Sequence, residues 1–382
     1  MKDDNTKRAL LLGAYGQSNL GDDLLLYNYL RLLRSKGYGS VVVNVSRADL
    51  VPDIICQEFP DLKTFVTYDT SMIRLLRLVR SSDIVVYGGG TVYKEMYGTT
   101  GRNPYSLVLR ILVFNAIVRI LGKRIYHLHI GIGMLKSRIG RQITKFCISP
   151  AHYTLFRDSE SYSFARRILR LPGRKLDVST DVLFVDPTWA QAWRRKALPI
   201  PPRQYKSVIG INVLHDVPDG IDQRSYIAVI RSFIEQQTTQ GHCIVMLPLQ
   251  HDFNENNDYR FMRDHFADIS GCFMVESIEL DVVADYLEQL DILIAMRFHS
   301  LLLATAIKAP YVAISYDPKC TRFLAENQYE HAIPLETLTL DALTTAYARV
   351  VNDRAGVVVQ LEGMARKNFD QGREWLDSFE LV

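Results

Sequence analysis

Cysteine is scarce in this 382-residue chain, and its five cysteines stand far apart. They lie at positions 56, 147, 243, 272 and 320, and no two of them form a CxxC pair. This spacing excludes a disulfide framework and offers no zinc-binding pattern, so we expect no bound metal. Scattered unpaired cysteines are typical of a reducing compartment, and we expect the protein in the cytoplasm.

The sequence also lacks a long uninterrupted apolar run. The longest candidate, residues 104–121, has 18 residues and is interrupted by Arg110, Asn115 and Arg119. That length barely reaches what a spanning helix needs, so we expect a buried helix beside a sheet or an interfacial helix that dips into lipid. The first residues, MKDDNTKRALLLGAYG, are too acidic, and their apolar run too short, for a signal peptide.

Acidic residues are absent between Glu95 and Asp158, a window that holds ten Lys and Arg. Residues 1–200 carry 30 Lys and Arg against 16 Asp and Glu, a net +14, whereas residues 201–382 carry 15 against 26, a net −11. The basic half fits either a solvated face or a surface for polyanions or anionic lipid. We expect no nucleic-acid partner, because the window is mostly aliphatic and offers few aromatic rings for base stacking.

Short apolar runs alternate with helical patterns through both halves of the chain. Residues 187–205 break this alternation with four prolines, two tryptophans and a basic cluster. The pattern predicts an α/β fold of two doubly wound, Rossmann-like domains that face each other across a cleft. We expect a basic N-terminal domain over residues 1–190, a linker over 191–205, and a C-terminal domain over 206–382 that ends in two helices.

The stretch from Asp291 to Lys319 predicts a βαβ unit, with strands at 291–295 and 311–315 and a helix at 300–308. In such units the residues at the carboxyl ends of the strands line the ligand crevice. Four polar residues follow these two strands: Arg297, His299, Asp317 and Lys319. Together with a helix N-terminus they predict a site for a small phosphorylated or carboxylated molecule.

The N-terminal half supplies further candidates at strand exits. Arg157 follows the strand at 151–156, where it either faces the crevice or forms an ion pair with Asp158 or another neighbour. Gly88, Gly89 and Gly90 follow the strand at 83–87 and let a ligand or a neighbouring loop approach the backbone, of which we favour the ligand.

The first strand, residues 9–13, leads into the loop AYGQSNLGDD and a helix. Its glycine spacing is neither GxGxxG nor GxxxxGK[ST], so it is a weak nucleotide signal. Asn19 and Asp22 either contact a ligand or cap the helix that follows.

Taken together, these motifs resemble the polysaccharide pyruvyl transferase family. The resemblance covers nearly the whole chain in the family's order, from GAYGQSNLGDD through Gly88–Gly90, the Gly131–Gly133 turn and Arg157-Asp158, and is strongest from Arg297 to Lys319. It implies two domains of the GT-B kind. It also implies transfer of a pyruvyl group from phosphoenolpyruvate to paired sugar hydroxyls, with formation of a cyclic ketal and release of phosphate.

The resemblance implies a donor site made by Arg157, Arg297, Asp317 and Lys319, with His299 and Arg297 as catalytic residues. Close cations suit a molecule that carries both a phosphate and a carboxylate. An imidazole can deliver or remove a proton near neutral pH. Asp317 then orients His299 or Lys319, or caps the next helix. Phosphoenolpyruvate is a co-substrate, and no cofactor is implied.

On the acceptor side we expect a sugar or lipid-linked oligosaccharide of a cell-surface polysaccharide or exopolysaccharide precursor. The candidate acceptor contacts are Asn19, Gly21, Asp22, Gly88, Gly89, Gly90 and Asp252. We expect the enzyme in the cytoplasm, peripheral at the inner face of the membrane through its basic N-terminal half.

Two other functions remain open at the level of sequence. One is a GT-B nucleotide-sugar glycosyltransferase of polysaccharide biosynthesis, for which only Glu276 and Glu279 offer a ribose site. The other is a non-catalytic scaffold of an envelope-polysaccharide assembly. The scaffold is disfavoured by the joint presence of four residues suited to chemistry: Arg157, Arg297, His299 and Lys319.

Overall fold

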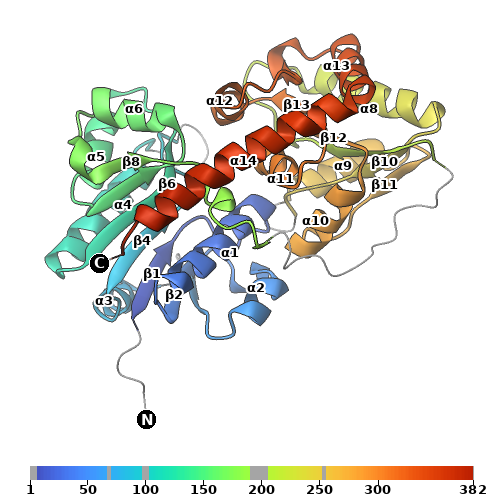
Figure 1. Ribbon diagram of the computed structural model, residues 1–382. Helices are drawn as coiled ribbons and strands as arrows, with labels where there is room; N and C mark the ends of the chain where they lie inside the picture. The colour runs from blue at the N-terminus through green and yellow to red at the C-terminus, as the bar shows by residue number, and fades with distance from the viewer. Residues whose placement is uncertain (1–6, 67–69, 97–102, 190–204, 252–254, 382) are drawn as a thin grey trace. The chain divides into compact units, whose positions relative to one another are not determined.

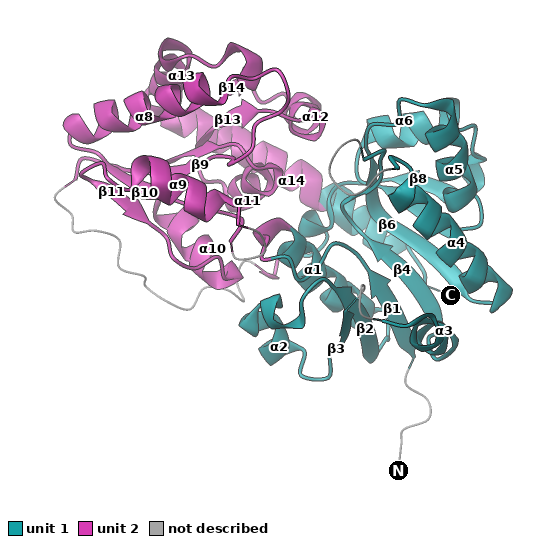
Figure 2. Cartoon of the chain, turned by 180° about the vertical axis from the view of Figure 1, so that it is seen from behind, with its two compact units in different colours: residues 1–17, 22–186, 370–382 teal, residues 18–21, 187–369 magenta. Residues whose placement is uncertain are grey.

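The computed structural model describes residues 7–66, 70–96, 103–189, 205–251 and 255–381. The chain divides into two units, drawn in teal and magenta in Figure 2. Unit 1 comprises residues 1–17, 22–186 and 370–382, and unit 2 comprises residues 18–21 and 187–369. None of the described helices combines the length and the apolar character that crossing a membrane requires.

The main sheet of unit 1 is parallel, with strand order β3-β2-β1-β4-β6-β7-β8 and β5 paired to β6. The chain winds outwards in one direction from β1 and in the other from β4. The carboxyl ends of β1 and β4 therefore form the switch point where such folds bind ligands. The bounds are β1 Arg8–Leu12, β2 Ser40–Val45, β3 Lys63–Val66, β4 Ile84–Gly88, β5 Thr91–Tyr93, β6 Arg124–Ile132, β7 Tyr153–Phe156 and β8 Leu176–Val178.

Helices α3, α4, α5 and α6 contribute to one hydrophobic cluster with the sheet, so they cover the same face of unit 1. Central strand β4 is buried along its whole length, which explains its unbroken apolar sequence. The helices of unit 1 are α1 Leu20–Ser35, α2 Asp53–Glu58, α3 Met72–Arg80, α4 Ser106–Ile120, α5 Arg138–Ile148 and α6 Ser159–Arg167, with short 3-10 turns at Ala48–Leu50, Gly173–Lys175 and Val182–Phe184.

Unit 2 contains a second parallel sheet, with strand order β11-β10-β9-β12-β13-β14. Its winding direction changes between β9 and β12, so the switch point of unit 2 lies at the carboxyl ends of these two neighbouring strands. The bounds are β9 Val208–Asn212, β10 Cys243–Met246, β11 Cys272–Met274, β12 Ile292–Ala295, β13 Tyr311–Ser315 and β14 Ala332–Pro334.

In unit 2 a helix follows each of the strands β9 to β13, and the last helix of the chain is long (Figure 1). Its residues 354–369 belong to unit 2, whereas residues 370–378 belong to unit 1. The bounds are α8 Gln223–Thr239, α9 Asp258–Phe266, α10 Leu280–Gln289, α11 Phe298–Ile307, α12 Pro318–Glu326, α13 Leu340–Asn352 and α14 Arg354–Ser378, with a 3-10 turn at Leu335–Thr337.

These two parallel sheets flanked by helices confirm the predicted α/β class with two Rossmann-like domains. The division of the chain differs from the predicted boundaries in three places: residues 18–21 group with unit 2, residues 370–382 group with unit 1, and residues 187–190 group with unit 2. The second difference has a clear cause. The Lys36 ammonium donates to the carbonyls of Leu376 (2.9 Å) and Phe379 (2.6 Å), and the Trp375 indole donates to the Tyr153 hydroxyl (2.9 Å). The predicted linker, residues 191–205, lies outside the described residues except for Tyr205.

Candidate functional site

Arg297 stands at the switch point of unit 2, where β12 ends and α11 begins. Its backbone N–H donates to Oδ1 of Asn212 at 3.0 Å, and the Asn212 amide donates to the carbonyl of Leu247 at 2.9 Å. Asn212 is buried at the end of β9. One amide side chain therefore ties the exits of β9, β10 and β12 together and fixes the backbone that carries Arg297.

The Arg297 guanidinium makes a bidentate contact with the buried carboxylate of Asp258. Nε donates to Oδ2 of Asp258 at 2.8 Å and Nη2 donates to Oδ1 at 2.7 Å, while Nη2 also donates to Gln250 at 2.8 Å. The Asp258 side chain is fully shielded from solvent at the start of α9. One edge of the guanidinium is thus occupied within the protein, which the sequence-based prediction of Arg297 as a donor-gripping residue did not anticipate.

Asp258 also binds a histidine. His215 lies in the segment after β9, and both its backbone N–H (3.3 Å) and its ring Nδ1 (2.9 Å) approach Oδ1 of Asp258. Burial on its own would raise the pKa of Asp258, but the charge of Arg297 and the hydrogen bonds from His215 and Arg297 outweigh it and hold that pKa below the usual range. Asp258 therefore remains an anion that orients two side chains.

His299 is the second residue of α11 and packs against the backbone at Gly21. A Cβ at position 21 would overlap Nδ1 of the imidazole, so only glycine leaves room for the ring as it stands. Both residues belong to unit 2. This contact explains structurally why residue 21 is a glycine, beside its predicted role in acceptor binding.

Residues 18–20 pair with the loop that follows β10. Leu20 N–H donates to the Leu249 carbonyl and His251 N–H to the Ser18 carbonyl, each at 3.0 Å, and Asn19 forms an antiparallel bridge with Gln250. The Asn19 side chain accepts from the Gly21 N–H at 3.0 Å, in the position that caps α1. The capping alternative for Asn19 is therefore the one observed, and its contact with an acceptor stays a prediction.

Asp317 and Lys319 lie at the exit of β13, as predicted. Asp317 caps α12 by accepting from the Lys319 N–H at 2.8 Å, and its Oδ2 stands 3.7 Å from the Lys319 ammonium. The same ammonium lies over the rings of Phe298 (5.9 Å) and Tyr316 (5.8 Å). Phe298 precedes His299, so the cation is held beside the first turn of α11. Of the alternatives that the sequence left open for Asp317, the structure shows two: Asp317 caps α12, and it contacts Lys319.

Arg157 belongs to unit 1, at the exit of β7. It is buried, with Nη2 donating to Oγ1 of Thr91 at 3.1 Å and Nη1 3.6 Å from Oδ2 of Asp181. Burial raises the pKa of Asp181, and the Arg157 charge opposes that rise. The predicted ion-pair alternative is therefore observed, with Asp181 as the partner, whereas Asp158 caps α6 through the Ser161 N–H (2.7 Å). The convergence of Arg157 with the unit 2 residues stays a prediction.

Two of the three glycines at the end of β4, Gly88 and Gly89, are explained by packing within unit 1. A Cβ on Gly88 would overlap the hydroxyl of Tyr15, which itself donates to the Gly88 carbonyl at 2.9 Å. Gly89 has a φ of +67° beside the ring of Tyr29. Gly90 has a φ of +74° and open space where a side chain would be, so it is the glycine that best fits ligand approach.

Asp22 lies in the first turn of α1 within unit 1, and its charge, after burial, contributes to raising the pKa of Tyr15. Asp252 lies outside the described residues. Among the residues that are described, no three His, Cys, Asp or Glu side chains group as metal ligands would.

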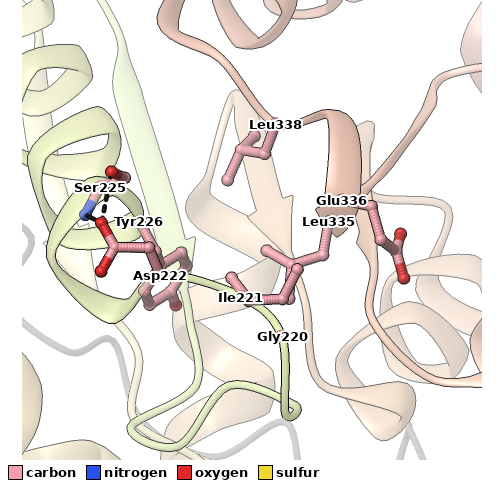
Figure 3. Close-up of a pocket in the computed structure, with 8 residues that line it drawn as sticks. All are labelled: Gly220, Ile221, Asp222, Ser225, Tyr226, Leu335, Glu336 and Leu338. Atoms are coloured by element: carbon pink, nitrogen blue, oxygen red, sulfur yellow. Dashed lines mark hydrogen bonds between the residues drawn. The ribbon is translucent and has the colours of Figure 1, made fainter.

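A pocket of about 180 Å³ lies elsewhere in unit 2, between the start of α8 and the turn after β14 (Figure 3). Asp222 and Glu336 contribute carboxylates to its lining, and Asp222 is bonded to Ser225. Two carboxylates disfavour an anionic ligand. The groups predicted to bind an anion lie around α11 and do not line this pocket.

Comparison with known proteins agrees with the fold. The structures that resemble the chain include the UDP-GlcNAc 2-epimerases of Neisseria meningitidis (TM-score 0.62, 10% identity, 98% of this chain and 99% of that one) and Methanocaldococcus jannaschii (0.62, 11%, 98% and 99%). A glycosyltransferase of Rickettsia africae also aligns (0.52, 10%, 98% and 100%). At such identities the likeness shows the fold alone, which is of the GT-B kind.

By sequence, no curated protein matches the chain. The model of one family, described as polysaccharide pyruvyl transferase, matches residues 19–318. The match begins at the segment that packs against His299 and ends at the cap of α12, so it includes Gly21, Arg157, Arg297 and Asp317, and it stops one residue short of Lys319. Because it spans most of the sequence, the chain belongs to the polysaccharide pyruvyl transferase family.

Proposed function

We propose that this polysaccharide pyruvyl transferase uses phosphoenolpyruvate as its donor and forms a cyclic ketal on a sugar of a cell-surface polysaccharide or exopolysaccharide precursor. The methylene carbon of the donor gains a proton and becomes a methyl group. Two sugar hydroxyls bond to the central carbon, and the bond from that carbon to the phosphate oxygen breaks. Of the two hydroxyl protons released, one balances the new methyl group and the other leaves with phosphate.

The observation that carries the proposal is the grouping around the first turn of α11, within a chain whose family match covers it. A helix N-terminus, the Lys319 ammonium and the Arg297 guanidinium together favour a ligand with two anionic groups. His299 stands in the same turn, held against Gly21, and we assign it the proton transfers.

Asp258 and His215 extend this assignment. Asp258 occupies the Nε edge of the Arg297 guanidinium and thereby fixes its orientation. We assign the contact with the donor to the edge of the guanidinium that faces away from Asp258. In this proposal Arg157 and Lys319 also bind the donor, and Asp317 holds Lys319 in position. The acceptor contacts that we propose are Asp22 and Gly90, with Asn19, Gly21, Gly88, Gly89 and Asp252 beside them.

No cofactor enters this reaction, since phosphoenolpyruvate is itself consumed. We place the reaction in the cytoplasm because all five cysteines are free thiols and a reducing compartment suits them.

A second candidate is transfer of a sugar from a nucleotide donor. It is favoured by the resemblance to a glycosyltransferase and to an epimerase whose structure was determined with UDP-GlcNAc bound. Its predicted ribose contacts, Glu276 and Glu279, precede α10, and Glu276 accepts a hydrogen bond from the Tyr259 hydroxyl. A carboxylate already paired in this way is a poorer partner for ribose.

Thermal unfolding with added ligand distinguishes the two candidates. A ligand that binds only the folded chain raises its unfolding midpoint, and the increase grows with the logarithm of the ligand concentration above Kd. We expect phosphoenolpyruvate to raise the midpoint and UDP to leave it unchanged, and Lys319→Ala to abolish the phosphoenolpyruvate effect. A shift with UDP and none with phosphoenolpyruvate would favour the glycosyltransferase.

A further inference from the structure

Several large apolar side chains of unit 1 point into solvent from two helices that cover its sheet. The exposed fractions are 56% for Val113 and 84% for Ile120 on α4, and 58% for Ile139 and 59% for Phe146 on α5. Single exposed apolar residues are common on protein surfaces, but grouped ones indicate an interaction site. These four residues define what we call the α4–α5 face.

Helix α4 is apolar on both of its sides. Val108, Ile111 and Val118 face the core of unit 1, whereas Leu109, Val113, Ala116 and Ile120 are exposed. The exposed set is spaced at i, i+4, i+7 and i+11, which forms one stripe along a helix. Of the two alternatives for residues 104–121, burial beside a sheet is observed for one side of this helix, and the interfacial position stays a prediction.

The two helices are direct neighbours in the layer that covers one face of the sheet, and both carry exposed apolar residues. The Asn115 amide of α4 donates to the Cys147 carbonyl of α5 at 2.9 Å, and the Cys147 thiol donates to the Val108 carbonyl at 3.3 Å. On α5, Ile139 and Phe146 are seven residues apart and therefore lie on the same side. Both helices belong to unit 1, where Figure 2 shows them in teal.

The charge of this surface has one sign. Helices α4 and α5 contain Arg110, Arg119, Arg138, Arg141 and Lys145 and no acidic residue. Helix α3, in the same helical layer, adds three arginines, no acid, and the exposed side chains of Met72 and Ile73. Exposed apolar residues among basic ones match the chemistry of an anionic bilayer, whose headgroups attract cations and whose interior accepts apolar side chains.

We propose that the α4–α5 face docks unit 1 onto an anionic phospholipid bilayer, with Val113, Ile120, Ile139 and Phe146 entering the interface and the flanking cations contacting headgroups. A second copy of the chain fits less well, because two such faces would oppose cation to cation. A nucleic acid fits less well because Phe146 is the one aromatic residue among the four. The proposal does not depend on the reaction, since docking requires neither donor nor acceptor.

Vesicle sedimentation with the full chain tests the proposal. We expect binding to phosphatidylcholine vesicles that contain roughly one third phosphatidylglycerol and little binding to phosphatidylcholine alone. Binding should weaken as salt rises, because salt screens the headgroup charge. Equal binding to both vesicles, or binding to neither, would overturn the proposal.

Two variants separate the apolar and the charged contributions. Ile120→Ser combined with Phe146→Ser should lower the partition coefficient at least roughly tenfold, because two large side chains no longer enter the interface. Arg119→Gln combined with Arg138→Gln should lower it roughly twentyfold at low salt and much less at high salt. Circular dichroism and the unfolding midpoint verify that the variants fold.

The matched control changes exposed apolar residues outside this face. Val351 and Val359 of unit 2 are 48% and 67% exposed, and serine at both positions should leave vesicle binding unchanged. An equal loss in this control and in the α4–α5 variants would contradict the proposal. So would self-association in the absence of vesicles that the α4–α5 variants abolish, since a second copy would then be the occupant.

Discussion

Asp258 holds two side chains at once, the guanidinium of Arg297 and the imidazole of His215. It is fully buried, so its charge is balanced inside the protein and not by water. Removing the charge from such a pair leaves the partner's charge buried without compensation. Arg297 is the partner that would be left with an uncompensated charge, and it precedes His299 by two residues in the chain.

We therefore predict that Asp258→Asn lowers the free energy of unfolding by about 3 kcal/mol. Turnover should fall roughly a hundredfold, since Arg297 and the start of α11 lose their fixed orientation. Chemical denaturation and initial-rate measurements provide the two readouts. Asp268→Asn is the matched control, because Asp268 pairs with Arg231 at the surface and should contribute little to stability or rate. Similar losses of stability and turnover in Asp258→Asn and Asp268→Asn would show that Asp258 does not hold Arg297 in the way described.

Gly21 offers a second test at this scale, because a methyl group there would meet the His299 ring. We predict that Gly21→Ala displaces the imidazole and reduces turnover roughly a hundredfold while the chain still folds. Gly363→Ala is the control, since Gly363 lies in α14 with open space around its Cβ position. It should stabilise the fold by up to about 1 kcal/mol and leave turnover unchanged. Full activity of Gly21→Ala would contradict the assigned packing.

At the residue scale, sequence alone located part of the site. Arg297, His299, Asp317 and Lys319 were predictable because each follows a recognisable buried strand. Asp258 was missed because it stands at the start of a helix after a polar loop, and its partners, His215 and Arg297, come from the exits of other strands. Contacts of this kind depend on which strands are neighbours, and local sequence does not encode that order.

Among the elements, β6 carries an unusual pair of histidines. His127 and His129 are fully buried, and His129 has a φ of +50° where the pairing of β6 with β7 shifts register. Burial lowers the pKa of both residues from 6.5 to about 3. Both imidazoles therefore stay neutral in the folded protein, bonded to Tyr93 and Tyr29.

This pair predicts the pH dependence of stability. Below pH 6.5 the unfolded chain binds protons that the folded chain does not bind until about pH 3, so stability falls as the pH drops through this window. Between about pH 7.5 and about pH 5, each histidine should cost about 2 kcal/mol of unfolding free energy. His127→Gln removes one titrating group, so calorimetry should show a smaller pH effect than in the parent chain. An unchanged pH effect would refute this explanation.

The sequence pattern predicted the boundaries of a strand well where every residue of that strand is buried. The strands β12 and β13 lie within a residue of their predicted bounds, 291–295 and 311–315. The strands β3, β8 and β14 were missed because each lies at a sheet edge, has at most one buried residue, and so lacks an apolar run.

For the whole molecule, α14 is the feature that sequence could not assign. Its periodicity predicts one helix, and the structure has one helix, but residues 370–378 pack in unit 1. The ring of Trp375 lies 4.5 Å from that of His129, and Trp375 itself is buried. Periodicity identifies the apolar side of a helix but not the domain against which that side packs.

The central claim is that this family member transfers a pyruvyl group from phosphoenolpyruvate, with His299 moving the protons. The most direct measurement follows phosphate release from phosphoenolpyruvate across a panel of glycan acceptors, with mass spectrometry of each acceptor. We predict acceptor-dependent phosphate release, a pyruvyl ketal on the acceptor, and a loss of at least roughly a hundredfold in His299→Ala with an unchanged circular dichroism spectrum. Ketal formation at the parent rate by His299→Ala would contradict the claim.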